Sequence, residues 1–272
     1  MTTSTRAITR APDRAAVQHI GLATTIRQSF TMGWRGLLKI RHNPEQLFDV
    51  VFQPVIFTLM FTYIFGGAIS GNVHSYLPTI IPGILVQTVI VASVVTGTQL
   101  REDMDKGVFD RFRSLPIARI SPLAGALLAD VVRYLIATAI TFTVGFAMGW
   151  RPDPVGVVAS TALILFCSFA VSWIFALLGC VMKKATAVQG VSMMIMFPLT
   201  FVSNAFVPVD TMPGWLQAFV TVNPVSHLVS AVRELCNTGH AGMHVVWSVV
   251  GAVALIAVFA PLAVRAYIRN AR

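Results

Sequence analysis

Charged residues are scarce in this sequence. Asp, Glu, Lys and Arg together make up 11% of the 272 residues, whereas a soluble domain has about 25%. Hydrophobic residues account for 56%, and the mean hydropathy is +0.74. A folded domain of this composition could not cover its surface with polar side chains. A soluble globular protein is therefore excluded.

Catalytic and metal-binding motifs are also missing. The chain contains no Gly-Lys dipeptide, so it has no G-x-x-x-x-G-K-[ST] loop and cannot hydrolyse ATP by itself. It has no HExxH and no G-x-S-x-G motif. Cys167, Cys180 and Cys236 form no CxxC pair, and we expect them to act as small apolar residues. His240 and His244 are four residues apart, but Gly239 and Gly242 disfavour a helix there and no third ligand is near. We expect no metal site and no cofactor in this chain.

Long uncharged runs take up most of the chain. Several extend for about 20 residues or more, the length that crosses the hydrocarbon core of a bilayer. Because the core holds no water to bond the backbone, such segments must be helices. The sequence predicts an all-α integral membrane protein, surrounded by membrane lipids, with six spans at about 47–68, 78–99, 121–150, 154–182, 185–207 and 245–264.

Basic residues are distributed unevenly among the segments that connect these spans. Seventeen of the 20 Lys and Arg residues lie in 1–46, 100–120, 183–184 and 265–272. The opposite side holds only Arg151 and Arg233, and Arg133 lies within the third span. Lys and Arg accumulate in cytoplasmic loops. The distribution predicts that both termini are cytoplasmic, and it explains the net charge of +9 without nucleic-acid binding.

The segment before the first span divides into two parts. Residues 1–21 are polar with three arginines, and we expect a disordered cytoplasmic tail. In residues 22–42, large apolar side chains recur at helical spacing with basic residues between them. This pattern predicts a helix lying in the cytoplasmic interface of the membrane. Residues 22–272 then form a single transmembrane domain.

One loop concentrates the charge. The stretch after the second span, residues 101–119, reads REDMDKGVFDRFRSLPIAR and has nine charged residues. On a helical wheel, one side carries Met104, Val108, Phe109, Phe112 and Leu115, and Pro116 ends the helix. Such a helix can rest on lipid headgroups or dock into a partner protein. Four of the nine charges are acidic, and an anionic leaflet repels acids, so docking is favoured.

The segment between the last two predicted spans is apolar but interrupted. Residues 207–235 read VPVDTMPGWLQAFVTVNPVSHLVSAVREL. Pro213, Asn223 and Pro224 divide it into two short helices, with Asn223 as the cap of the second and Pro224 at its first position. Arg233 and Glu234 are expected near water at the outer end of the second helix.

Two stretches carry a resemblance to a known family. Residues 101–119 and residues 198–235, PLTFVSNAFVPVDTMPGWLQAFVTVNPVSHLVSAVREL, resemble ABC-2 type permeases, especially the membrane subunits of bacterial daunorubicin/doxorubicin-type resistance exporters. The resemblance implies a permease in the bacterial inner (plasma) membrane that moves a hydrophobic or amphipathic, drug-like compound outward. It implies a separate cytoplasmic ATPase subunit that holds ATP and Mg, and a second permease chain, identical or related.

The same resemblance implies roles for individual residues. The charged loop would be the coupling helix, and its docking positions would be Glu102, Asp103, Gly107, Phe109, Asp110, Arg111, Phe112 and Leu115, with Asp110 where the family commonly has Glu. The two short helices would be a re-entrant pair closing the outer end of the pathway. This external gate would include Pro213, Trp215, Asn223 and Pro224. An interfacial helix that only stabilises the fold is the alternative.

The sequence indicates the substrate-binding residues less clearly than the docking residues. Met193, Met196, Phe197 and Phe201 surround Pro198, and such side chains suit a lipophilic, planar or cationic compound, although lipid contact or helix packing is the favoured explanation. Asp130 and Arg133 are three residues apart and predict a structural ion pair near the cytoplasmic interface. Two other functions fit the sequence, namely export of a lipid or polysaccharide precursor and a membrane assembly or sensor protein that moves no solute.

Overall fold

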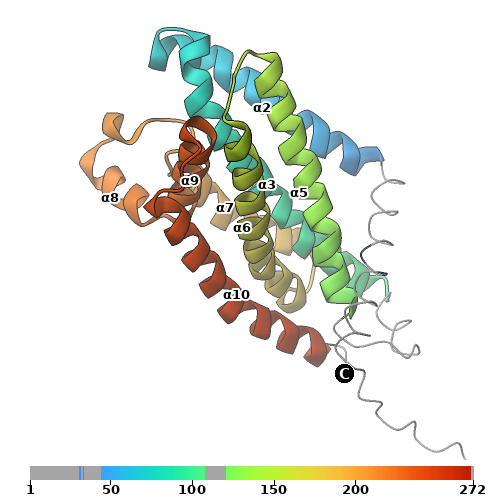
Figure 1. Cartoon of the computed structure of the whole chain (residues 1–272). Coiled ribbons are helices and arrows are strands. Elements are labelled where there is room, and N and C mark those ends of the chain that lie inside the picture. The colour runs from blue at the N-terminus through green and yellow to red at the C-terminus, as the bar shows by residue number, and fades with distance from the viewer. Residues whose placement is uncertain (1–30, 32, 34–43, 108–120, 271–272) are drawn as a thin grey trace, which may run out of the picture.

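The structure is a computed structural model that describes residues 31, 33, 44–107 and 121–270. These residues contain eight α-helices and one short 3-10 helix (Figure 1). The fold is all-α, as the sequence predicts. The helices are α2 (Pro44–Ser70), α3 (Val73–Asp105), α5 (Ser121–Ala147), α6 (Pro154–Val181), α7 (Ala185–Phe201), α8 (Gly214–Val222), α9 (Pro224–Thr238) and α10 (Met243–Asn270), with the 3-10 helix η1 at Val209–Thr211.

Four helices are long and apolar enough to cross a membrane, namely α3, α5, α6 and α10. Two shorter apolar segments, Val51–Gly67 of α2 and Ala185–Phe201 of α7, complete the set. Several helix boundaries differ from the prediction, including the end of α10 at Asn270. The second helix continues to Asp105, well into the charged stretch, and the fifth ends at Phe201 rather than at 207.

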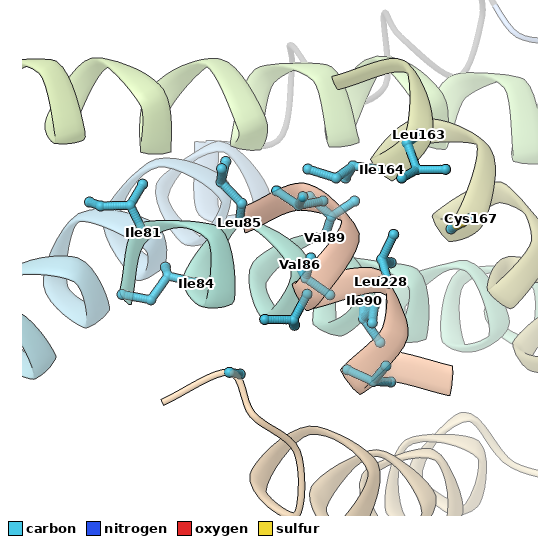
Figure 2. Packing of buried hydrophobic residues seen from close by; sticks show 14 of the residues in the cluster. Ile81, Ile84, Leu85, Val86, Val89, Ile90, Leu163, Ile164, Cys167 and Leu228 are labelled. Carbon is cyan, nitrogen blue, oxygen red and sulfur yellow. The ribbon is translucent and has the colours of Figure 1, made fainter. Parts of the chain in front are cut away.

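Helix α3 is the centre of the bundle. It packs against α2, α5, α6, α7 and α9, and most of its middle turns are buried (Figure 1). Figure 2 shows the apolar side chains of α3 gathered with Leu163, Ile164 and Cys167 of α6 and with Leu228 of α9. Lipid is as apolar as these side chains, so close packing, rather than exclusion of water, holds such helices together.

The contact between α3 and α6 depends on two glycines. A Cβ atom on Gly97 would lie 2.3 Å from the carbonyl oxygen of Phe175, and one on Gly179 would lie 2.4 Å from that of Gly97. Small residues let the backbones of two membrane helices approach this closely. Gly97 and Gly179 therefore set the distance between the central helix and α6.

Little of the segment before α2 is described. Thr31 and Gly33 are helical, and a Cβ on Gly33 would lie 3.4 Å from Cβ of Leu128, so this point of the chain lies beside α5. The predicted tail 1–21 and nearly all of the predicted interfacial helix 22–42 lie outside the described residues.

We predict that Gly97→Ala lowers the thermal stability of the protein. The new methyl group overlaps the Phe175 carbonyl, and overpacking of this kind costs about 1–3 kcal/mol. The midpoint of thermal unfolding in detergent measures the effect. Gly190→Ala in α7 is the control, because a Cβ there meets no atom within 4 Å and alanine favours the helix by about 1 kcal/mol. Equal midpoints for the two variants would contradict the close approach.

Candidate functional site

The charged stretch begins as the last turn of α3. Glu102 is exposed and Asp103 half-buried. The N–H of Lys106 still makes a helical bond to the carbonyl of Glu102. The helix stops after it, because the N–H of Gly107 bonds to the carbonyl of Met104 and Gly107 has a φ of 65°. One continuous helix from 101 to 115 is therefore wrong, because this left-handed residue interrupts it. The other predicted docking residues, Phe109, Asp110, Arg111, Phe112 and Leu115, lie outside the described residues.

Arg101 anchors this end of α3. Its Nη1 donates to the carbonyl oxygen of Met182 at 3.0 Å, and its Nε donates to Oδ1 of Asp105 at 3.0 Å. Lys106 Nζ and Glu102 Oε2 are 3.5 Å apart one turn away, in an exposed pair. Exposed pairs of this kind contribute little to stability. The bond from Arg101 to Met182 matters more for the site, since it ties the end of α3 to the end of α6.

A buried polar cluster lies deeper between α3, α5 and α6. Arg133 Nη1 is 2.8 Å from Asp130 Oδ1, so the predicted pair is confirmed. The two residues are 2% and 3% exposed, a depth that their spacing in the sequence does not indicate. Thr96 of α3 donates to Asp130 at 2.5 Å, and Arg133 Nη2 donates to Gln99 Oε1 at 3.3 Å.

The opposite end of the bundle contains a break in the helices. After α7 ends at Phe201, the backbone leaves the helix and passes through buried residues 203–206. Asn223 holds this break. Its Nδ2 donates to the carbonyls of Leu199 and Val202, both at 2.8 Å, and its Oδ1 accepts from the N–H of Val225 at 2.9 Å. Asn223 therefore caps α9, as predicted, and also satisfies the end of α7.

Arg233, which is half-buried, supports the same break. Its Nη2 donates to the carbonyls of Thr79 at 3.0 Å and Asn204 at 2.9 Å. Tyr76 adds a bond to the Phe206 carbonyl at 2.5 Å. Helical spacing could have indicated that Arg233 faces the bundle, because Arg233 follows the buried Val229 by four residues and shares its face of α9.

The predicted external gate is divided between buried and exposed positions. Pro213 precedes the exposed start of α8, and Trp215 is 75% exposed. Asn223 is buried at the joint, and Pro224 begins α9. Helix α9 packs against α3, α6 and α10, whereas α8 lies at the edge of the bundle (Figure 1). The second short helix is thus an internal element and not a surface helix.

The predicted substrate residues lie on two sides of α7. Met196 is buried in the core and Met193 is half-buried. Phe197 is 59% exposed, and its ring stacks on that of Phe201 with centroids 4.7 Å apart. The stack continues from Phe201 to Phe206 at 5.4 Å. The exposed face of α7 therefore carries two stacked aromatic rings at its C-terminal end.

The candidate metal residue His244 has other partners than His240. Its Nδ1 is 3.1 Å from Nδ1 of His227, and its Nε2 is 3.7 Å from Glu234. In 44–107 and 121–270, no three His, Cys, Asp or Glu side chains are placed to hold a metal ion. The three cysteines are free and buried, in line with a packing role.

These features define a class of protein. Apolar helices cross the membrane several times, one end of the bundle ends in a charged stretch, and the other contains a broken helix held by polar side chains. Together with the missing nucleotide-binding loop, they describe the membrane subunit of a transporter whose energy comes from elsewhere.

Comparison with known proteins identifies the family. The model of the ABC-2 type transporter family matches residues 27–236. The chain belongs to this family, as a multi-pass membrane permease subunit of an ABC exporter without an ATPase domain. Permeases of this family pair with an ATP-binding subunit.

Individual relatives agree with this assignment. The chain is 47% identical to the daunorubicin resistance ABC transporter permease protein DrrB1 of Streptomyces coeruleorubidus, over 90% of this chain and 87% of the relative. It is 24% identical to the probable doxorubicin resistance ABC transporter permease protein DrrC of Mycobacterium tuberculosis, over 88% and 87%. It is 25% identical to the putative transport permease ycf38 of Cyanophora paradoxa, over 77% and 74%.

We predict that Asn223→Asp destabilises the protein and lowers export. Aspartate keeps the acceptor for Val225 but has no donor for the carbonyls of Leu199 and Val202. Each buried carbonyl left unpaired costs about 1–3 kcal/mol. The amount of folded protein in membranes and its thermal midpoint in detergent measure the effect.

Asn72→Asp is the matched control. Asn72 caps α3 by accepting from the N–H and the hydroxyl of Ser75 at 2.8 and 2.9 Å, a role that aspartate fills equally well. A loss of stability as large as that of Asn223→Asp would show that the two carbonyl bonds are not the cause.

Proposed function

We propose that this chain is the permease of an exporter that moves hydrophobic or amphipathic, drug-like compounds outward across the bacterial inner membrane. The observation that carries the proposal is the 47% identity, over 90% of the chain, to a daunorubicin resistance permease. ATP and Mg would be bound and used by a separate cytoplasmic subunit, since this chain has no loop to hold the phosphates.

The proposed topology has six spans within a single domain, 22–272, and both termini in the cytoplasm. Four long helices and two shorter apolar segments support the number of spans. The basic residues at 100–120, 183–184 and 265–272 support the orientation. In this orientation α8 and α9 lie at the outer end. Burial of α9 supports a re-entrant pair with the gate residues Pro213, Trp215, Asn223 and Pro224, because non-helical backbone at membrane depth must be enclosed by protein.

The stretch 101–115 is proposed to dock the ATPase subunit. The described part of it leaves α3 with exposed charge at Glu102 and a turn at Gly107. The aromatic residues that follow, Phe109 and Phe112, would enter a cleft of the partner, with Asp103, Asp110, Arg111 and Leu115 around them. Charged rims give such a contact its specificity, and aromatic anchors contribute most of its binding energy.

The pathway is proposed to run along α7, facing a second permease chain that is identical or related. Few side chains of α7 are buried within the single chain, namely Val188, Ser192, Met196 and Thr200. The opposite face exposes Phe197 and Phe201, with Met193 beside them. Stacked rings of this kind attract planar aromatic and cationic compounds.

We predict that Phe109→Ala with Phe112→Ala separates this chain from its ATPase. The double variant should remain folded in membranes, lose the co-purifying ATP-binding subunit after gentle solubilisation, and lose ATP-driven export. Recovery of the ATPase and full export in this variant would contradict the docking assignment.

Phe146→Ala with Phe166→Ala is the control for that experiment. Both of these phenylalanines are exposed on the spans, at α5 and α6. Their replacement removes the same number of aromatic rings without touching the charged stretch. The control should keep both the bound ATPase and export.

We predict that Phe197→Ala with Phe201→Ala lowers resistance to daunorubicin while the ATPase subunit stays bound. Removal of the exposed stack takes away the aromatic face that planar compounds would contact, at about 1–3 kcal/mol for each ring that stacks on a base-sized ligand. Growth of a sensitive host carrying this permease and its ATPase subunit, at graded drug concentrations, measures the effect.

This growth assay, together with deletion of the gene and a measurement of ATP hydrolysis, distinguishes the other two functions. If wild-type protein gives no resistance but its deletion alters the cell envelope, a lipid or polysaccharide precursor is the cargo. If an ATP-binding protein binds without any stimulation of ATP hydrolysis, the chain recruits a partner and moves no solute.

A further inference from the structure

In the buried cluster between α3 and α5, the ion pair and the hydrogen bonds between the helices involve different partners. Its ion pair, Asp130 and Arg133, lies entirely within α5, so it does not by itself join two helices. The bonds that cross between helices end on uncharged residues of α3. Thr96 donates to Asp130 Oδ2, and Gln99 Oε1 accepts from Arg133 Nη2.

The ion pair gives each crossing bond a charged partner. A hydrogen bond with one ionised member is shorter and stronger than a neutral one, and the surrounding apolar medium strengthens it further. A charge buried without its counter-charge would be strongly unfavourable in this place. The pair in α5 therefore neutralises itself, and each of its two residues makes one further bond to α3.

The position of the cluster relates it to the charged stretch. Helix α3 leads into this stretch and α5 leads out of it. Thr96 lies nine residues before the end of α3, and Asp130 lies nine residues after the start of α5. At 1.5 Å per residue, the Thr96–Asp130 bond is about 14 Å from both ends. The crossing bonds therefore join the helix that precedes the proposed docking stretch to the helix that follows it.

Other contacts tie the same pair of helices to the rest of the bundle. Gly97, next to Thr96, lies against the backbone of α6 at Phe175. Tyr134, next to Arg133, has its hydroxyl 2.6 Å from that of Ser172 in α6. A separate apolar core lies on the side of the charged stretch and contains Leu100, Leu123, Leu127, Trp173, Ala176, Cys180, Ala263 and Tyr267.

Apolar packing alone would not fix the register of α3 against α5. Apolar side chains have many nearly equivalent arrangements, and the best-attested use of a buried polar contact is to select one register. A push on the charged stretch could then slide or rotate one helix past the other. Two directional bonds at separate positions, Thr96 and Gln99, prevent this motion.

We propose that Thr96 and Gln99, bonded to the Asp130–Arg133 pair, form a lock that makes α3 and α5 move as a single lever when the ATPase subunit acts on the charged stretch. The proposal rests on the proposed function, in which that stretch docks the ATPase. The four side chains are positioning residues. They contact neither ATP nor the substrate, and they determine how much of the motion reaches the spans.

The test is Thr96→Val with Gln99→Leu, which removes both crossing bonds and leaves the ion pair in place. The permease and its ATPase subunit are reconstituted together in lipid vesicles, and daunorubicin transport and ATP hydrolysis are measured on the same preparation. We expect ATP hydrolysis to stay within about twofold of wild type while drug moved per ATP falls about tenfold, within the range by which coupling residues act. An unchanged ratio of transport to hydrolysis would overturn the lock, even if both rates fall.

Two further variants make the ratio decisive. Thr98→Val is the matched control, because the Thr98 hydroxyl donates only to the Val95 carbonyl of its own helix, at 3.0 Å, and its ratio should equal that of wild type. Thr96→Ser, made in a chain that keeps Gln99, retains the hydroxyl. It should therefore keep most of the wild-type ratio of transport to hydrolysis. A ratio for Thr98→Val as low as that of the double variant would overturn the lock.

The outcomes separate the lock from the function on which it rests. If wild-type vesicles show neither ATP-driven transport nor stimulated hydrolysis, the proposed function fails. If wild type is coupled and the double variant does not fold, Asp130→Leu with Arg133→Met takes its place, since apolar side chains often replace a buried ion pair without loss of stability. A wild-type ratio in that variant would overturn the lock.

Discussion

Every part of this structure depends on one constraint, the need to satisfy backbone hydrogen bonds without water. A helix meets it within the segment, so apolar runs become helices. Where a helix has to stop inside the bundle, side chains must take over. The end of α7 shows the consequence, because Asn223, Arg233 and Tyr76 supply donors to five carbonyls around the break. The break is therefore stabilised by specific side-chain donors, which satisfy carbonyls that a continuous helix would otherwise satisfy.

The central helix connects the two ends at which a transporter must act. Near the start of α3, Tyr76 and the carbonyl of Thr79 belong to the network around the broken helix. Near its end, Thr96 and Gln99 bond to α5, and Arg101 bonds to the end of α6. A rigid element that contacts both regions can carry a change from one to the other. In the proposed exporter, α3 would link the ATPase to the outer end of the pathway.

Local chemistry made some positions predictable and left others hidden. The cap at Asn223 followed by Pro224 was readable, because a cap needs only its own neighbours in the chain. The pairing of Asp130 with Arg133 was readable for the same reason, at three residues apart in one helix. The bond of Arg233 to Thr79 was not, since 154 residues separate its partners. The turn at Gly107 was also missed, because helical periodicity continues on both sides of it.

The sequence by itself determined the class of protein, the helical fold, most span positions and the absence of a nucleotide-binding loop, because composition, apolar length and local motifs are properties of short stretches of chain. Only the tertiary structure decided which polar groups meet. It ended α7 at Phe201, bonded Arg233 to the carbonyls of Thr79 and Asn204, and brought Thr96 to Asp130. Such contacts depend on the distance and rotation between packed helices, which close approaches such as that of Gly97 and Gly179 set.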